Sequence, residues 1–123
     1  MSAALCLMAG GLMLALPPDG HFRLQWTHSV EKTEWREDWR RVPGGLKLER
    51  AAIKGSGAGM EPGPDARLVD GWLVWSPKVA PVSTLVIAAS GMTASGWTLC
   101  ASETCQVLGG TAGEAITLRP CQN

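Results

Sequence analysis

The sequence predicts an all-β fold, a small antiparallel β-sandwich or barrel of about 7–9 short strands. Three observations support this prediction. Apolar and polar residues alternate in several segments, clusters of Pro, Gly and Ser separate these segments at short intervals, and no helix of ten or more residues is indicated after the first 18 residues. With 123 residues, the chain has room for one domain and one modest core.

The first 18 residues differ from the rest of the chain because they contain no charged side chain. We predict a signal sequence or an N-terminal membrane tether over residues 1–18 and a single β-rich domain over residues 19–123. The apolar run 3–16 is shorter than the roughly 20 residues that cross a bilayer, which favours a signal sequence. No Lys or Arg precedes this run and residues 14–18 make a poor cleavage site, which leaves the tether as the alternative. Either predicts export to the periplasm or cell envelope.

Alternation begins at Phe22 and predicts a strand over residues 22–30, followed by a second strand over 35–42. The polar residues 31–34 are expected to form the hairpin loop between them. A helix over 31–42 is the alternative, because Glu, Lys and Arg are good helix formers. Trp35 and Trp39 alone would give that helix only a thin apolar stripe, so the strand is preferred.

Turn and loop signals divide the remaining sequence. Pro-Gly-Gly at 43–45 predicts a turn, and segment 46–54 alternates but changes phase near Ala51, which indicates a β-bulge. Residues 55–66 contain four glycines and two prolines and predict a long loop. Short strands are then expected at 68–76, 84–90, 97–100, 105–108 and 115–118.

Three of the four cysteines lie in the last quarter of the chain, which predicts one disulfide and one leftover thiol in an exported protein. If Ser102 and Glu103 form a two-residue hairpin loop, Cys100 faces Cys105 at a spacing suited to a disulfide. A bond from Cys121 to either of them is the alternative. The cysteines and the two histidines lack the spacing of a zinc site, so no metal is expected.

No recognisable set of catalytic residues is present, so no catalytic residue and no cofactor is assigned, and a protein that is not an enzyme is favoured. His28 lies in a predicted strand, close to Glu31, Glu34 and Glu37 in the hairpin. A His beside a carboxylate can act as a proton shuttle or a metal ligand. The alternative is a core imidazole that a neighbouring group satisfies. The glycine-rich residues 55–60 lack the Gly-Lys-Ser/Thr ending of a phosphate-binding loop.

Six tryptophans, against one Phe and no Tyr, are too many for so small a core. Trp35, Trp39 and Trp72 are therefore expected on a partner-binding surface, where Trp is favoured. The alternative is that Trp35 and Trp39 simply cover one sheet face beneath arginine stems. Nucleic acid is not expected as a partner, because the net charge is zero and no stretch concentrates Lys and Arg.

Four blocks of the sequence resemble one family. They are Trp-Thr-His-Ser-Val-Glu-Lys-Thr at residues 26–33, Trp35 with Glu37, Gly-Ala-Gly-Met at 57–60 and Asp-Gly-Trp at 70–72. In this order they resemble the uncharacterised family known as domain of unknown function 1850 (DUF1850), over roughly residues 20–100. The resemblance implies a small exported bacterial protein, often encoded beside a tripartite ATP-independent periplasmic (TRAP) transporter of the TAXI type. The candidate binding residues that match its blocks are His28, Ser29, Glu31, Glu37, Gly57, Gly59 and Met60.

Three functional hypotheses follow. The first is an accessory or binding protein whose partner is the TRAP/TAXI permease or its solute receptor, and it predicts an exposed patch that holds Trp35, Trp39 or Trp72. The second is a small hydrolase or metal-dependent enzyme that uses His28 with a nearby carboxylate. The third is a structural envelope protein with a filled interior and no pocket near His28.

Overall fold

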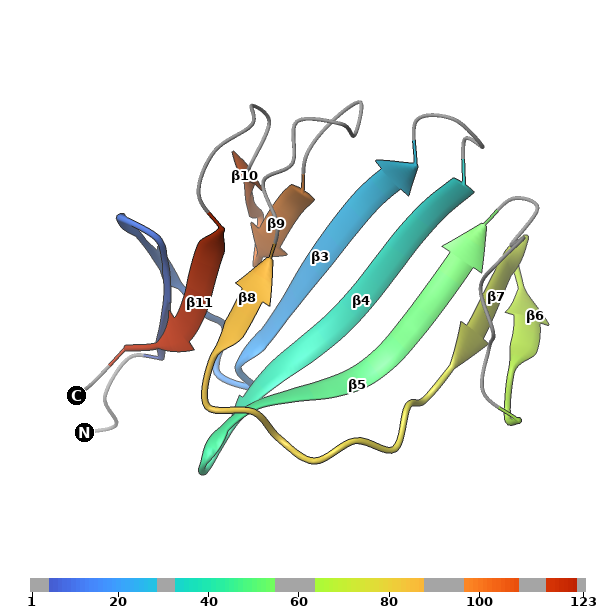
Figure 1. Cartoon of the computed structure of the whole chain (residues 1–123), viewed down its shortest axis with the longest axis horizontal. Coiled ribbons are helices and arrows are strands. Elements are labelled where there is room, and N and C mark those ends of the chain that lie inside the picture. The colour runs from blue at the N-terminus through green and yellow to red at the C-terminus, as the bar shows by residue number, and fades with distance from the viewer. Residues whose placement is uncertain (1–4, 29–32, 55–63, 88–96, 109–114, 122–123) are drawn as a thin grey trace.

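The computed structural model describes residues 5–28, 33–54, 64–87, 97–108 and 115–121 (Figure 1). These residues form strands and no helix, so none of the described segments contains a helix that could cross a membrane. The strands are β1 (Cys6–Ala9), β2 (Leu12–Ala15), β3 (His21–His28), β4 (Thr33–Val42), β5 (Gly45–Lys54), β6 (Arg67–Val69), β7 (Trp72–Trp75), β8 (Leu85–Ile87), β9 (Trp97–Ala101), β10 (Thr104–Leu108) and β11 (Ile116–Pro120).

The strands form two antiparallel sheets, which confirms the predicted all-β, sandwich-like fold. One sheet has four strands in the order β2-β1-β11-β8, and the other has seven in the order β10-β9-β3-β4-β5-β7-β6. Neither sheet closes on itself, so the fold is not a barrel. In Figure 1, β1, β2 and β11 lie on the left and β6 and β7 on the right, at opposite ends of the molecule.

The main core lies between the two sheets. Leu7 of β1 and Leu118 of β11 come from the smaller sheet, and Phe22, Leu24 and Leu99 come from the larger one; all five side chains are fully buried. A second, smaller cluster on the same face of the larger sheet joins Ala51, Ile53 and Trp75 with the half-buried Trp35 and Ala66. We call this face of the seven-stranded sheet the inner face, and the opposite one the outer face.

The long hairpin of β3 and β4 confirms the predicted strands at its centre. β3 pairs with β4 from His21↔Arg40 to His28↔Thr33, so the helix considered for residues 31–42 is wrong. Of the loop predicted at 31–34, residues 31–32 lie outside the described residues, and the prediction is wrong for Thr33 and Glu34, which pair with β3 as the first residues of β4. β4 then turns through Pro43 and Gly44 into β5, as predicted, because Val42 pairs with Gly45.

A β-bulge in β5 lets both halves of the strand point apolar side chains inward. Trp39 pairs with Leu48 and Asp38 pairs with Arg50, so Glu49 is an extra residue in the ladder. Leu48 before the bulge and Ala51 after it therefore both lie on the inner face. This confirms the bulge that the phase change predicted.

The eleven strands exceed the expected 7–9 for two reasons. Segment 68–76, expected as one strand, is a hairpin of β6 and β7 that turns at Asp70 and Gly71. Both residues have positive φ, 52° and 85°, which is the backbone of the tight turn that Asp-Gly favours between paired strands.

The second reason is the N-terminal segment assigned above to a leader. Residues 6–15 form β1 and β2, and β1 pairs with β11 through Leu7↔Pro120, Met8↔Arg119 and Ala9↔Leu118. Leu14 and Leu16 are buried in the main core together with Leu7. In the structure of the whole chain this segment is therefore part of the folded sheet, and its later cleavage or tethering stays a prediction.

Candidate functional site

The outer face of the seven-stranded sheet gathers most of the cationic side chains of the chain. Alternation along β3, β4, β5 and β6, with the ladder registers, places seven cationic and three acidic residues on this face. The described residues include ten cations and eight acids, so only three of these cations but five of these acids lie elsewhere. The outer-face set is Arg23, Arg36, Arg40, Lys47, Arg50, Lys54 and Arg67 with Glu34, Asp38 and Glu49.

Asp38 is the buried centre of this face. Asp38 is 8% exposed. Its Oδ1 accepts a hydrogen bond from Nε of Arg23 at 2.8 Å and lies 2.9 Å from Nε2 of His21. Burial raises the pKa of Asp38, but the hydrogen bonds and charges of Arg23 and His21 outweigh this effect, so its pKa lies below the usual value. The carboxylate therefore stays charged and ties β4 to β3.

A cavity of about 370 Å³ opens beside this cluster, lined by His21, Arg23, Asp38, Glu49 and Arg50. Its charges are largely paired, since Arg23 binds Asp38 and Arg40 Nε lies 3.0 Å from Glu49 Oε2 at its margin. No group of three or more His, Cys, Asp or Glu side chains in the described part of the chain is arranged to hold a metal ion.

Further along the outer face, Arg36 lies on Trp72. The guanidinium carbon of Arg36 is 3.9 Å from the Trp72 ring centroid, and Nζ of Lys54 is 5.7 Å from the same centroid. Both separations are within the range of cation–π attraction. A hollow of about 240 Å³ adjoins this stack, lined by the polar residues Gln25, Thr27, Glu34, Arg36 and Thr98 and by Trp26, Trp35 and Trp72.

Glu37 lies on the inner face between two tryptophans of its own strand. Its Oε2 accepts the indole N–H of Trp35 and its Oε1 accepts that of Trp39, both at 2.8 Å. Residues i and i+2 of a strand share one face, which is why this short stretch brings the three side chains together. Among the expected binding residues, Glu37 is the one whose side chain the structure describes, and it acts as a clamp for both indoles.

The expected tryptophan surface divides between the two faces. Trp39 is 6% exposed and stacks near Phe22, with ring centroids 6.4 Å apart, so it belongs to the core and not to an exposed surface. Trp35 is half-buried and meets Trp75 edge-on at 5.7 Å. Trp72 is half-buried on the outer face, beside Arg36, and is the one of the three that cationic side chains surround.

Most residues of the family blocks lie outside the described part of the chain, namely Ser29, Glu31, Gly57, Gly59 and Met60. The structure describes the backbone of His28, which is the last residue of β3 and pairs with Thr33 of β4. Glu37 pairs with Leu24, which lies four residues from His28 along β3. At the usual rise per residue, this step separates Glu37 from His28 by about 13 Å along the ladder. This spacing does not favour a hydrogen-bonded pair of His28 and Glu37, and Glu34 lies on the opposite face from Glu37.

The cysteines form two disulfides, Cys100–Cys105 and Cys6–Cys121. The first crosses the β9–β10 hairpin with its Cα atoms 4.1 Å apart, in the register expected from the Ser102-Glu103 turn. The leftover thiol was a wrong expectation, because Cys121 is bonded to Cys6, with a Cα separation of 5.4 Å. Because Cys6 was expected in the leader and not in the domain, it was not considered as a partner for Cys121.

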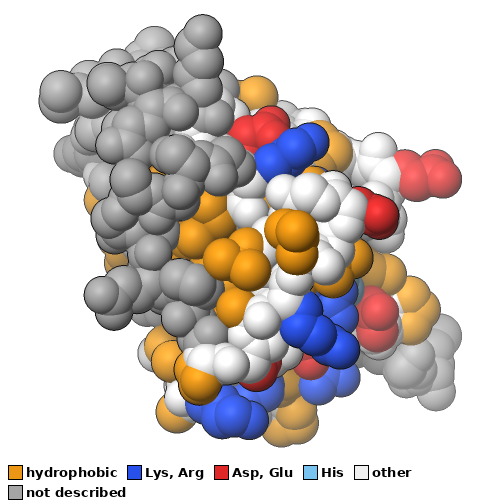
Figure 2. All heavy atoms as spheres, turned by 90° about the vertical axis from the view of Figure 1, so that its right-hand side faces the viewer, with side chains coloured by type: hydrophobic (Ala, Val, Ile, Leu, Met, Phe, Trp, Pro, Cys, Tyr) orange, Lys and Arg blue, Asp and Glu red, His pale blue; other side chains and the backbone are white. Residues whose placement is uncertain are grey.

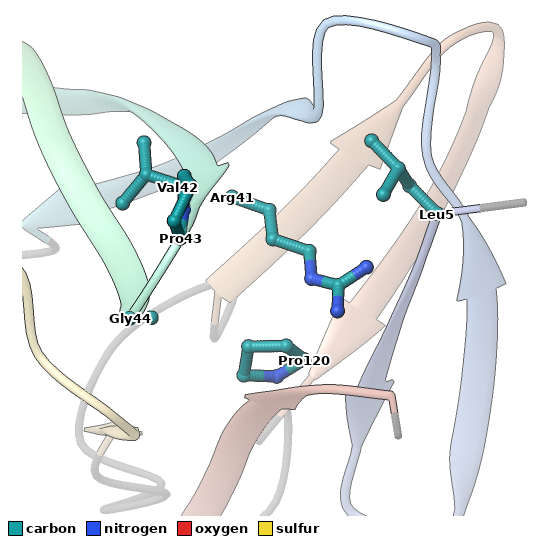
Figure 3. Close-up of a pocket in the computed structure, with 7 residues that line it drawn as sticks. Leu5, Arg41, Val42, Pro43, Gly44 and Pro120 are labelled. Carbon is teal, nitrogen blue, oxygen red and sulfur yellow. The ribbon is translucent and has the colours of Figure 1, made fainter. Parts of the chain in front are cut away.

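A second cavity of about 370 Å³ lies near the chain ends, where Arg41 reaches from β4 towards Leu5 and Pro120 (Figure 3). Its Nη2 donates a hydrogen bond to the carbonyl oxygen of Cys121 at 3.3 Å. This bond joins the larger sheet to Cys121, which directly follows β11 and is bonded to Cys6. We interpret this arginine as a link between the two sheets.

Sequence reasoning missed the outer-face cluster of His21, Arg23, Asp38 and Arg36. Its signal was present, because the polar positions of residues 22–30 and 35–42 alternate with the apolar ones. What was missing was the register that sets Arg23 beside Asp38. A cation and a carboxylate on two consecutive strands, 15 residues apart, cannot be paired without that register.

These features define a class: a disulfide-linked, all-β domain of two open sheets, with a cationic outer face and, on the inner face, a carboxylate that binds two tryptophans. The chain belongs to the family described as Domain of unknown function (DUF1850), whose model matches residues 22–108. No curated protein matches the chain. No solved structure matches it either.

Proposed function

We propose that the protein is an exported accessory protein of the cell envelope that works with a TRAP transporter of the TAXI type. Its outer face docks on an acidic surface of the permease or of the solute receptor. The transporter association rests on the family resemblance, and the two disulfides fit an oxidising compartment. One observation carries the docking surface: of the ten cations and eight acids in the described part of the chain, seven cations and three acids lie on this face, in a protein with zero net charge.

Charge separated in this way suits recognition of a partner of opposite sign. Complementary potentials steer two proteins together and fix their orientation, and the effect weakens as salt rises. Arg50, Lys54 and Arg67 are exposed and available for such contacts. On the side of the molecule that carries β6 and β7, Lys and Arg side chains lie beside hydrophobic ones (Figure 2).

Trp72, on the strand next to the edge of the sheet, gives this face an aromatic residue suited to binding a partner. Binding energy at protein interfaces concentrates on a few Trp, Tyr and Arg residues, and Trp72 is a half-buried Trp flanked by an Arg and a Lys. The exposed Val69 lies directly opposite Trp72 in the β6–β7 ladder and adds apolar surface at the sheet edge.

The test is a capture experiment with the purified full chain as bait and detergent-solubilised membranes and periplasm of the producing cells as prey. Mass spectrometry should recover a TRAP permease subunit or its solute receptor at low salt, with less recovered at about 0.5 M NaCl. The variant Arg50→Glu/Arg67→Glu should lose it. Arg119→Glu, an exposed reversal on β11 of the other sheet, should retain it. Equal recovery by both variants, or recovery of no transporter component, would contradict the proposal.

A further inference from the structure

We propose that the hollow beside the stacked Arg36 and Trp72 is a binding site for a single carboxylate group. The inference deepens the proposed function, because it names the chemistry that this part of the outer face recognises. It rests on the state of Arg36, the size of the hollow and the polar groups around it.

Arg36 differs from the other two arginines of β4 in having no anionic or carbonyl partner among the described residues. Arg40 lies against Glu49, and Arg41 donates to the carbonyl of Cys121. Arg36 instead contacts the Trp72 ring, and its Nε is buried without a hydrogen-bond acceptor in the described part of the structure. A guanidinium has five N–H donors in a fixed plane, so most of its hydrogen-bonding capacity is not used by the described residues.

The electrostatic surroundings favour an anion at this point. Burial has the largest effect and lowers the pKa of Arg36, the charge of Arg23 lowers it further, and the carboxylates of Asp38 and Glu34 act in the opposite direction without cancelling the decrease. A bound anion would stabilise the charged guanidinium at this point. Lys54 is a second cation on the same Trp72 ring. Glu34 also lines the hollow, and its one negative charge faces the two positive charges of Arg36 and Lys54.

The dimensions decide how much of a ligand can enter. A hollow of about 240 Å³ is smaller than the roughly 300–1,000 Å³ of sites that enclose whole small molecules. It therefore holds one end of a ligand, with the rest outside.

The lining groups select the kind of anion. Arg36 offers the paired N–H donors that match the two oxygens of a carboxylate, and Thr27, Thr98 and Gln25 can donate further hydrogen bonds. The indole of Trp72 holds the guanidinium in place and offers an apolar surface to the carbon next to the carboxylate. A doubly charged phosphate would be repelled more strongly by Glu34 than a carboxylate with one charge.

Two sources can supply this group: a small organic acid, or a Glu or Asp side chain of the docking partner. The experiment is an NMR titration of the purified, ¹⁵N-labelled full chain, following the Trp72 indole N–H signal, which Trp72→Phe assigns. Succinate represents the small acid and N-acetyl-glutamate N-methylamide represents the protein side chain. Succinamide is the uncharged comparison and inorganic phosphate is the competing anion.

Saturable shifts with either carboxylate, and none with succinamide, are expected. Arg36→Gln should weaken binding at least about tenfold, and Arg36→Lys should weaken it less, since charge without the planar fork is retained. Arg40→Gln, on the same strand and face but outside the hollow, should bind as the wild type does. The tighter of the two carboxylate probes identifies the source.

Three results would overturn the inference: no saturable shift with either carboxylate, unchanged binding in Arg36→Gln, or phosphate binding as tightly as the carboxylates. Preserved dispersion of amide signals in each variant shows that the fold is intact. Because this titration needs no partner, saturable binding together with a failed transporter capture would refute the docking proposal alone. Successful capture without carboxylate binding would refute this inference alone.

Discussion

Cys6 and Cys121 are bonded to each other across a sequence separation of 115 residues, which joins the first strand of the chain to the residue after the last. A crosslink that closes so long a loop removes much of the conformational freedom of the unfolded chain. The other disulfide spans only five residues. The two bonds therefore differ in how strongly they restrict the unfolded state.

The first prediction concerns these two disulfides. Cys6→Ser/Cys121→Ser should lower the free energy of unfolding by about 4–5 kcal/mol, and Cys100→Ser/Cys105→Ser by about 2 kcal/mol, on the loop-entropy relation. Denaturant unfolding followed by tryptophan fluorescence measures both. A larger loss from the short-range pair would show that native-state contacts, and not loop length, decide the contribution.

The second prediction tests whether the N-terminal hairpin supports the fold. Leu7 is fully buried between the sheets, whereas Leu12 on the neighbouring strand is 46% exposed. Leu7→Ala should cost about 2–5 kcal/mol of stability because it leaves a cavity in the core. Leu12→Ala, the matched control, should cost well under about 1 kcal/mol. Equal, small effects would mean that β1 does not contribute to the core of the folded protein.

The third prediction concerns the carboxylate that holds Trp35 and Trp39. Glu37→Gln keeps the shape, but its amide NH₂ cannot accept a hydrogen bond, so one indole N–H loses its acceptor. The expected cost is about 1–3 kcal/mol, together with a change in the near-ultraviolet circular dichroism of the tryptophans. Glu34→Gln, on the outer face of the same strand, should change neither. An unaltered spectrum in Glu37→Gln would contradict the clamp.

The fourth prediction is a pH dependence that comes from Asp38. Its pKa is lower in the folded than in the unfolded state, so its contribution to stability is complete above the unfolded value near 4. That contribution is lost as pH falls through the lower, folded pKa. The melting temperature should therefore drop below about pH 4, and Asp38→Asn should be less stable at pH 6 but show a shallower drop. Parallel acid profiles for both proteins would rule Asp38 out as the cause.

Local patterns predicted a large part of the fold. Alternation identified β3 and β4, the phase change near Ala51 identified the bulge, and the Ser102-Glu103 turn identified the register of Cys100 and Cys105. Each of these depends only on residues that are near one another in sequence. Such features are set by the period of side chains along a strand and by turn chemistry.

The features that sequence reasoning missed depend on long-range pairing or on an ambiguous apolar run. Residues 6–15 are apolar enough for a signal sequence, and only their pairing with β11 shows that they form strands. Asp70-Gly71 is a typical turn pair, but apolar residues on both sides led to the prediction of one continuous strand over 68–76. The outer-face charge cluster required the β3–β4 register, because cations and acids are interleaved along the sequence.

The bulge at Glu49 also determines which changes of chain length β5 can tolerate. Deleting one codon there would restore uninterrupted alternation. Leu46 and Leu48 would still face the core together with Ala51 and Ile53, because Glu49 is the one residue of β5 without a ladder partner in β4. Deleting a residue elsewhere in β5 would instead exchange inside and outside for part of the strand. Among homologous genes, a one-residue change in the length of this strand is therefore expected at Glu49 first.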